Sequence, residues 1–117
     1  MIKLKKAYRI KKNEHFQLVF KKGKSFANRE LVIYYKRNPL QGHFRVGLSV
    51  GKKIGNAVTR NRIKRYLREA FTQLENEIVP DIDIIIIARN RTAEMGFHGI
   101  KKSLSHLLYK EKLFKKK

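Results

Sequence analysis

The sequence predicts a single α+β domain, residues 1–117, with elements in the order helix, three strands, helix, strand, helix. Three observations lead to this fold. Residues 31–37 and 43–50 alternate apolar and polar side chains as strands do. Residues 57–74 repeat apolar side chains at helical spacing, and the run at 82–88, IDIIIIA, is typical of a strand covered on both faces. A strand, a helix and a strand in this order indicate a crossover, which places strand 82–88 parallel to strand 43–50 in a mixed four-stranded sheet.

The net charge of the chain indicates which class of partner it binds. The 117 residues include 29 Lys+Arg against 9 Asp+Glu, a formal net charge of +20. A chain this basic needs an anionic partner, and a nucleic acid gains affinity from released counterions. The longest apolar run is too short to span a bilayer, so we expect no membrane partner. Without cysteine there is no disulfide-linked partner and no thiolate metal site. With no secretory signal in view, we expect a cytoplasmic protein.

The first 23 residues combine a basic arm with a short helix. We expect residues 1–12 to be irregular and held by Leu4, Tyr8 or Ile10. Asn13 is a plausible N-cap for a helix that ends at Gly23. One face of this helix carries Phe16, Val19 and Phe20, and Leu18 lies nearly opposite. All four could be core residues, or one side could meet the core and the other a groove.

The next segments predict strands. A brief strand at 25–28 turns at 28–30 into strand 31–37, and a second turn at 38–42 leads to strand 43–50, which suggests an antiparallel hairpin of the latter two. One face of this hairpin is apolar. The other carries Val32, Tyr34, Lys36, Arg45, Gly47 and Ser49. Aromatic rings among cations suit single-stranded RNA, although an ordinary solvated sheet face would have the same composition.

The central helix carries the densest positive charge. Asn56 is expected to cap it, and its apolar arc is Ile63, Leu67, Ala70, Phe71 and Leu74. The opposite side holds Asn61, Lys64, Arg65 and Arg68, with Arg60 and Arg62 beside them. No acidic residue occurs between Gly51 and Arg68, whereas solvated helix faces usually mix both signs. The preceding glycine-lysine turn lacks the Lys-Ser/Thr pair of a nucleotide-binding loop. This predicts a nucleic-acid face rather than an NTPase.

The last third of the sequence, from Asp81 onward, predicts structural elements but no catalytic site. Asp81 is placed at the edge of the last strand, and Asp83 is expected to make one satisfied polar contact. Thr92 could cap a final helix with the stripe Phe97, Ile100, Leu104, Leu107 and Leu108. His98 and His106 lack metal-ligand spacing, and residues 112–117 are expected to form a basic tail. No nucleophilic constellation or carboxylate pair emerges, so we predict no catalytic residue and no metal site.

The block VGKKIGNAVTRNRIKR at residues 50–65, followed by Arg68-Glu69, resembles the signature of the protein subunits of bacterial ribonuclease P. The similarity continues through the Phe16/Phe20 helix, the Tyr34 strand and the isoleucine strand, and so covers essentially the whole chain. It implies an α/β sandwich with a left-handed strand–helix–strand crossover, against the usual right-handed rule. It also implies an endoribonuclease that removes the 5′ leader of precursor tRNA, with magnesium in the holoenzyme reaction and catalysis carried by an RNA subunit.

The resemblance assigns residues to two partners. Those implied for the catalytic RNA are Lys52, Lys53, Asn56, Arg60, Asn61, Arg62, Lys64, Arg65 and Arg68. Those implied for the leader are Phe16, Phe20, Val32 and Tyr34, with Arg45 and Tyr109 as further members; in this reading Leu18 helps to meet the core. The runner-up is a ribosomal or ribosome-associated RNA-binding protein. A membrane-surface or polyanion-binding antimicrobial protein would explain the charge but not the strands.

Overall fold

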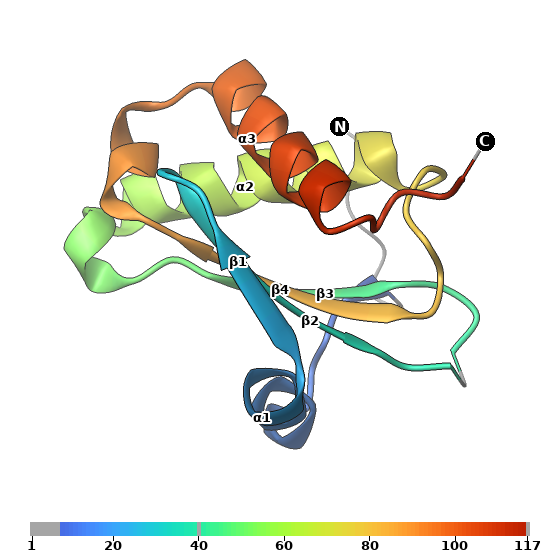
Figure 1. Cartoon of the computed structure of the whole chain (residues 1–117). Helices are drawn as coiled ribbons and strands as arrows, with labels where there is room; N and C mark the ends of the chain where they lie inside the picture. The colour runs from blue at the N-terminus through green and yellow to red at the C-terminus, as the bar shows by residue number, and fades with distance from the viewer. Residues whose placement is uncertain (1–7, 40, 117) are drawn as a thin grey trace.

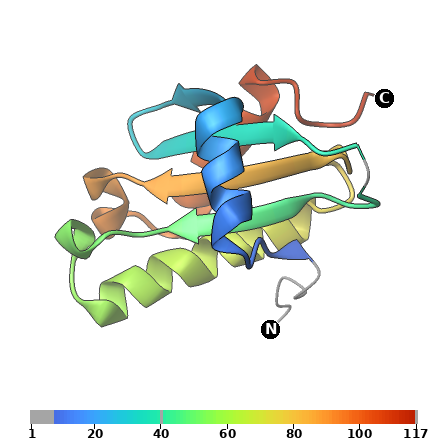
Figure 2. The ribbon, with the colours of Figure 1, turned by 90° about the horizontal axis from the view of Figure 1, so that it is seen from below.

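The computed structural model describes residues 8–39 and 41–116 as an α/β sandwich (Figure 1). The elements follow the predicted order. They are α1 Asn13–Lys22, β1 Lys24–Ala27, β2 Leu31–Arg37, β3 Arg45–Ser49, α2 Ala57–Leu74, β4 Ile82–Ala88 and α3 Phe97–Lys110. Two short 3₁₀ turns, η2 at Lys52–Ile54 and η3 at Asn90–Glu94, lie beside α2 and after β4. Helices α2 and α3 cover one face of the sheet and α1 crosses the other (Figures 1 and 2).

The sheet is mixed and four-stranded, with the order β1-β2-β4-β3. Strand β4 pairs parallel with β3, as predicted, and antiparallel with β2. The predicted β2–β3 hairpin is therefore wrong, because β4 lies between these strands. An almost entirely apolar strand is most stable where both its faces and both its edges are covered, which is the interior of the sheet. The hairpin that does form joins β1 to β2, and the Asn28 side chain accepts hydrogen bonds from the Glu30 and Leu31 amides. The handedness of the β3–α2–β4 crossover stays a prediction.

Strand β4 supplies core residues to both layers. Ile82, Ile84 and Ile86 pack among the apolar faces of α2 and α3, where Ile63, Leu67 and Leu104 are fully buried. Ile85 faces the other way and is buried with Val19 of α1 and Ile10. The stripe predicted for the last helix lies in the first of these clusters, with Phe97 at its margin.

Helix α1 meets the sheet through Val19, which is 1% exposed. Leu18 is 47% exposed, so the prediction that Leu18 helps to meet the core is wrong. The reason is a close approach at Gly47: an added Cβ there would lie 2.3 Å from the Phe16 ring. With Phe16 seated over the bare Gly47 backbone, Val19 points into the sheet and Leu18 points to solvent.

The segments flanking the domain are held more firmly than their composition indicates. Tyr8 packs against the larger core, and the Ile10 amide donates to the Val46 carbonyl at 2.9 Å, so both are anchors of the arm; Leu4 lies outside the described residues. Leu113 is 4% exposed and its carbonyl accepts from the Val79 amide at 2.9 Å. Most of the predicted basic tail is therefore packed on the domain rather than free.

Thr92 does not cap the last helix. It lies in η3, is fully buried, and donates from Oγ1 to the Arg89 carbonyl at 2.7 Å. Helix α3 begins only at Phe97, after Gly96. A hydroxyl that satisfies its own turn is a common alternative to a helix cap, and the sequence does not distinguish the two.

A buried ion pair joins β3 to β4. Arg45 donates from Nε and Nη2 to the two carboxylate oxygens of Asp83, at 2.9 and 2.8 Å. Asn38 also donates to this carboxylate, so Asp83 makes more than the one expected contact. Burial acts to raise the pKa of Asp83, but the hydrogen bonds and charge of Arg45 outweigh it and hold that pKa below its usual value.

Replacing Asp83 by Asn should lower the free energy of unfolding by about 2–3 kcal/mol at pH 7, because it leaves the Arg45 guanidinium partly buried without its carboxylate. Urea titration measures this. The contribution of a carboxylate with a depressed folded-state pKa is present above its unfolded pKa and is lost as pH falls through the folded value. The difference between the two proteins should therefore shrink below about pH 4. Asp81→Asn, which removes the partner of the exposed Arg37, is the control and should cost less than about 1 kcal/mol. Equal losses for both variants, or a pH-independent difference, would contradict the assignment.

Candidate nucleic-acid interface

The sheet face under α1 is divided into three rows that run across the strands. Strand register places Gly47, Ile85, Tyr34 and Ser25 in the middle row. Helix α1 lies along this row, with Phe16 over Gly47, Val19 against Ile85, and the Phe20 and Tyr34 ring centroids 5.0 Å apart (Figure 2). The helix therefore leaves one row of the sheet on each of its sides.

The two flanking rows differ in chemistry. One contains Arg45, Asp83 and Lys36, and His15 of α1 reaches the Arg45 guanidinium at 3.3 Å. The other contains Ser49, Ile87, Val32 and Ala27, which carry no charge. Because His15 marks the charged side of α1, helical geometry turns Phe16 and Phe20 toward the uncharged side. The second row and these two rings form what we call the aromatic groove: its floor is Ser49, Ile87, Val32 and Ala27, and its wall is Phe16, Phe20 and Tyr34.

The aromatic groove is accessible to a partner. Phe20 is 38% exposed, and Phe16, Tyr34, Val32 and Ile87 are all half-buried. Phe20 and Tyr34 meet edge to face at an interplanar angle of 77°, which covers less ring surface than a parallel stack would. Such rings can stack on unpaired bases, which fits a groove for single-stranded nucleic acid.

A hollow of about 180 Å³ at the β3 edge joins the aromatic groove to α2. Gly47 and Leu48 line it from β3, Phe16 from α1, and Lys64 and Arg68 from α2. Burial, and then the positive charge of Arg9, lower the pKa of Arg68. Like charges are thus concentrated in a partly desolvated hollow, an arrangement that an anion would stabilise.

Helix α2 presents its basic side outward because its apolar arc is buried. The Asn56 side chain caps the helix by accepting from the Thr59 amide at 3.0 Å, which confirms its predicted structural role. Lys52, Lys53, Asn56, Asn61 and Arg65 are exposed, and Lys64 and Arg68 are half-buried. These residues follow one another from the η2 turn along α2, and we call them the basic face.

Some arginines of this helix are already oriented by the protein. Arg60 donates from Nε to the Gly55 carbonyl at 3.2 Å, and Arg62 from Nη2 to the Ala93 carbonyl at 2.8 Å. The Arg65 guanidinium lies 5.5 Å from the centre of the Tyr66 ring. Each retains free donors, and a fixed guanidinium loses less entropy when it binds a phosphate.

Two residues predicted for the leader lie away from the aromatic groove. Arg45 is in the charged row on the other side of α1 and is paired with Asp83. Tyr109 is 73% exposed on α3, in the layer on the opposite face of the sheet. Conversely, sequence reasoning missed Ile87 and Ser49 as floor residues. The outward position of Ser49 was visible in the strand alternation, but its neighbour Ile87 follows only from the placement of β4 between β2 and β3.

The described residues offer little to a magnesium ion. Within 8–39 and 41–116, no three His, Asp or Glu side chains are grouped as potential ligands. Two of the described carboxylates are paired within the protein, Asp83 with Arg45 and Glu30 with Arg91 at 3.9 Å. The donor set therefore does not fit a protein-bound magnesium site. In the same ranges no helix is long and apolar enough to cross a membrane.

A cationic helix face joined to an exposed aromatic groove defines an RNA-binding protein. Comparisons with known proteins make this specific: residues 4–112 match the Ribonuclease P family. The ribonuclease P protein component of Oceanobacillus iheyensis is 68% identical over 112 residues, which cover 96% of this chain and 93% of that one. That of Listeria monocytogenes is 57% identical over 114 residues, covering 97% and 96%.

Solved structures agree. The Staphylococcus aureus RNase P protein superposes with a TM-score of 0.87 at 50% identity, covering 94% of this chain and all of that one. The Thermotoga maritima RNase P protein gives 0.79 at 31% identity, covering 87% and 96%. The chain belongs to the ribonuclease P protein family. It is thus a protein component of the endoribonuclease complex that processes the 5′ ends of tRNA.

Proposed function

We propose that the basic face of α2 binds the catalytic RNA of ribonuclease P and that the aromatic groove binds the 5′ leader of precursor tRNA. The observation that supports this division is the hollow at the β3 edge, where Phe16 of the groove and Lys64 and Arg68 of the basic face share one cavity. A single-stranded leader that runs from the catalytic RNA at α2 enters the aromatic groove directly from this hollow. The scissile end of the leader therefore lies at the β3 edge, and its 5′ end points toward β1.

Each surface suits its proposed partner. A folded RNA presents closely spaced phosphates, and the cations of the basic face replace condensed counterions around them. A single-stranded leader exposes its bases, which stack on Phe20 and Tyr34 without regard to sequence. The uncharged floor at Val32 and Ile87 accepts ribose and base surface without needing a hydrogen-bond partner. The protein thus senses the presence of a leader.

Hydrolysis itself belongs, in this proposal, to the catalytic RNA. Two carboxylates are held by partners within the protein, Asp83 by Arg45 and Glu111 by the Tyr35 hydroxyl. The magnesium ions of the reaction would be held by RNA, since the described acids form no ligand set. The protein contributes by holding the leader and by lowering the repulsion between two RNA molecules. Such a role places it in the cytoplasm, with precursor tRNA.

Phe20→Ala should weaken binding of precursor tRNA by the reconstituted holoenzyme by about 1–3 kcal/mol, because it removes a stacking ring. Binding of mature tRNA, which has no leader, should change little. Equilibrium binding of both RNAs measures the difference. Leu18→Ala is a matched control, since Leu18 is an exposed apolar residue on the same helix but faces away from the groove. Equal losses for precursor and mature tRNA would remove the leader assignment.

Arg65→Ala should weaken the complex between the protein and the catalytic RNA, and the dependence of log K on log salt should become less steep by about one unit. Titration at several salt concentrations gives this slope. Lys102→Ala removes the same charge from the exposed side of α3 and should leave both quantities unchanged. An unaltered slope for Arg65→Ala would show that the basic face is merely solvated.

A further inference from the structure

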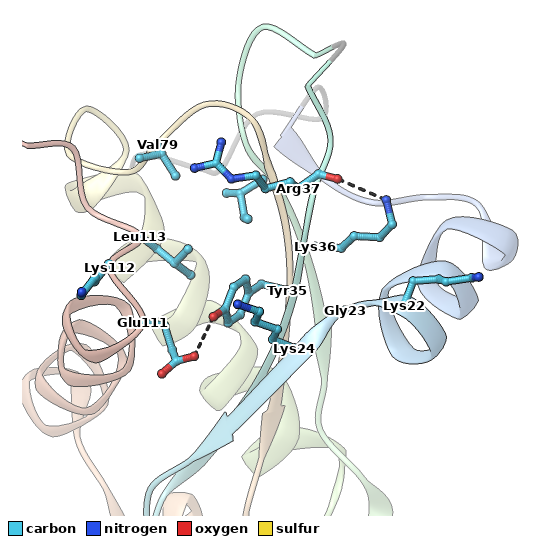
Figure 3. Close-up of a pocket in the computed structure, with 11 residues that line it drawn as sticks. Lys22, Gly23, Lys24, Tyr35, Lys36, Arg37, Val79, Glu111, Lys112 and Leu113 are labelled. Carbon is cyan, nitrogen blue, oxygen red and sulfur yellow. Dashed lines mark hydrogen bonds between the residues drawn. The ribbon is translucent and has the colours of Figure 1, made fainter.

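A second cationic hollow lies on the other face of the sheet, at the end of β2. It encloses about 410 Å³ between the α1–β1 junction, the end of β2, the segment before β4 and the end of α3 (Figure 3). Neither surface described above includes it. Its floor is partly apolar, from Val79, Ile82 and Leu113, and five of its lining residues are Lys or Arg. We call it the β1-edge pocket.

The pocket contains fewer carboxylates than cations, with Glu111 in its lining and Asp81 beside it. Glu111 accepts a hydrogen bond from the Tyr35 hydroxyl at 2.6 Å, and Asp81 beside the pocket pairs with Arg37. Burial, and then the bond and charge of Glu111, raise the pKa of Tyr35 to about 12, so its hydroxyl stays a neutral donor. Over the described part of the chain, no carboxylate forms an ion pair with Lys22, Lys24 or Lys112. These three lysines leave the pocket with uncompensated positive charge.

The lysines are placed around the mouth rather than gathered at one point. Lys24 reaches over Tyr35, while Lys22 and Lys112 stand on opposite rims and point outward (Figure 3). Gly23 permits this arrangement, because a Cβ there would lie 2.4 Å from the Tyr35 carbonyl oxygen. The α1–β1 junction is therefore pressed against β2, with a lysine on each side of it.

Lys112 occupies a position that favours glycine. Its φ is 58°, and the Leu113 amide donates to the Leu108 carbonyl at 2.9 Å, which is the usual glycine-ended closure of a helix. An L-residue there costs about 1–2 kcal/mol relative to a right-handed conformation. The closure fixes the backbone of Lys112 at the rim of the pocket, and a glycine there would preserve it.

A short path connects the aromatic groove to the β1-edge pocket. The floor of the groove ends at Ala27 on β1, which is the edge strand of the sheet. All four β1 residues are exposed, and Phe26, which is 37% exposed, alternates to the other face together with Lys24. A single-stranded RNA that leaves the aromatic groove at Ala27 therefore crosses only β1 before it reaches the Phe26 ring. Lys24 of the pocket follows on the same face as Phe26.

We propose that the 5′ part of a long leader passes over β1, contacts Phe26, and places its phosphates on the lysines of the β1-edge pocket. This inference rests on the proposed groove, which fixes the direction in which the leader runs. The occupant is single-stranded RNA because the pocket continues an RNA path, has an apolar floor and aromatic approach for bases, and carries unpaired cations for a backbone. The protein then has a second leader contact that short leaders never reach.

The test is a double variant, Lys24→Ala with Lys112→Gly, in the reconstituted holoenzyme. Glycine suits φ 58°, so this change removes a cation without straining the backbone. Kd is measured for precursor tRNAs whose leaders are lengthened one nucleotide at a time. The wild type should gain affinity in two steps, first as the groove fills and again as the pocket is reached. The variant should lose only the second step, with Kd for long leaders raised about tenfold through two lost phosphate contacts.

Lys101→Ala with Lys102→Ala removes the same charge from α3 outside the pocket and should retain both steps. Thermal unfolding of the double variant checks that the fold is intact. A retained second step in the pocket variant would overturn the inference, as would an equal loss at every leader length or weaker binding of the catalytic RNA alone. Absence of the first step in the wild type would instead contradict the proposed groove, so the two failures are distinguishable.

Discussion

Everything in this fold depends on one strand that is buried on both faces. Ile84 and Ile86 of β4 support the layer of α2 and α3, while Ile85 supports α1. Because both layers pack on the same strand, the basic face and the aromatic groove have a fixed relation to each other. A polar residue in place of Ile85 would weaken the packing of α1 and of the groove residues Phe16 and Tyr34, although Ile85 itself is in neither RNA surface.

The arrangement reconciles a net charge of +20 with a compact domain. The floor of the aromatic groove is uncharged, and the cations of that sheet face, Arg45 and Lys36, lie in the row on the other side of α1. The Arg45–Asp83 ion pair lies on the side of α1 away from this floor, where it joins two strands. The mutual repulsion of the surface cations is relieved when RNA binds, so the same charge that opposes folding favours assembly.

Sequence patterns predicted the elements well because each has a clear period. The alternation in 31–37, the helical arc of α2 and the isoleucine run were sufficient for the order of elements, and the motif at 50–65 for the family. The sequence patterns said less about which strands pair and how the elements pack together. A hairpin of β2 and β3 was the simplest connection, and nothing local shows that β4 enters between them. The positions of Ile87 beside the aromatic groove and of Tyr109 on the opposite layer likewise follow only from how the elements pack. The prediction for Leu18 was wrong for a different reason. The position of α1 on the sheet depends on Gly47, where the absence of a side chain leaves room for the Phe16 ring.

The central claim is that this protein lets a catalytic RNA recognise and cleave leader-bearing substrates. The most direct measurement combines the purified protein with the catalytic RNA at low magnesium and follows removal of the 5′ leader from precursor tRNA. The account predicts cleavage much faster than with the RNA alone, together with tighter binding of precursor than of mature tRNA. Cleavage no faster than with the RNA alone would contradict it.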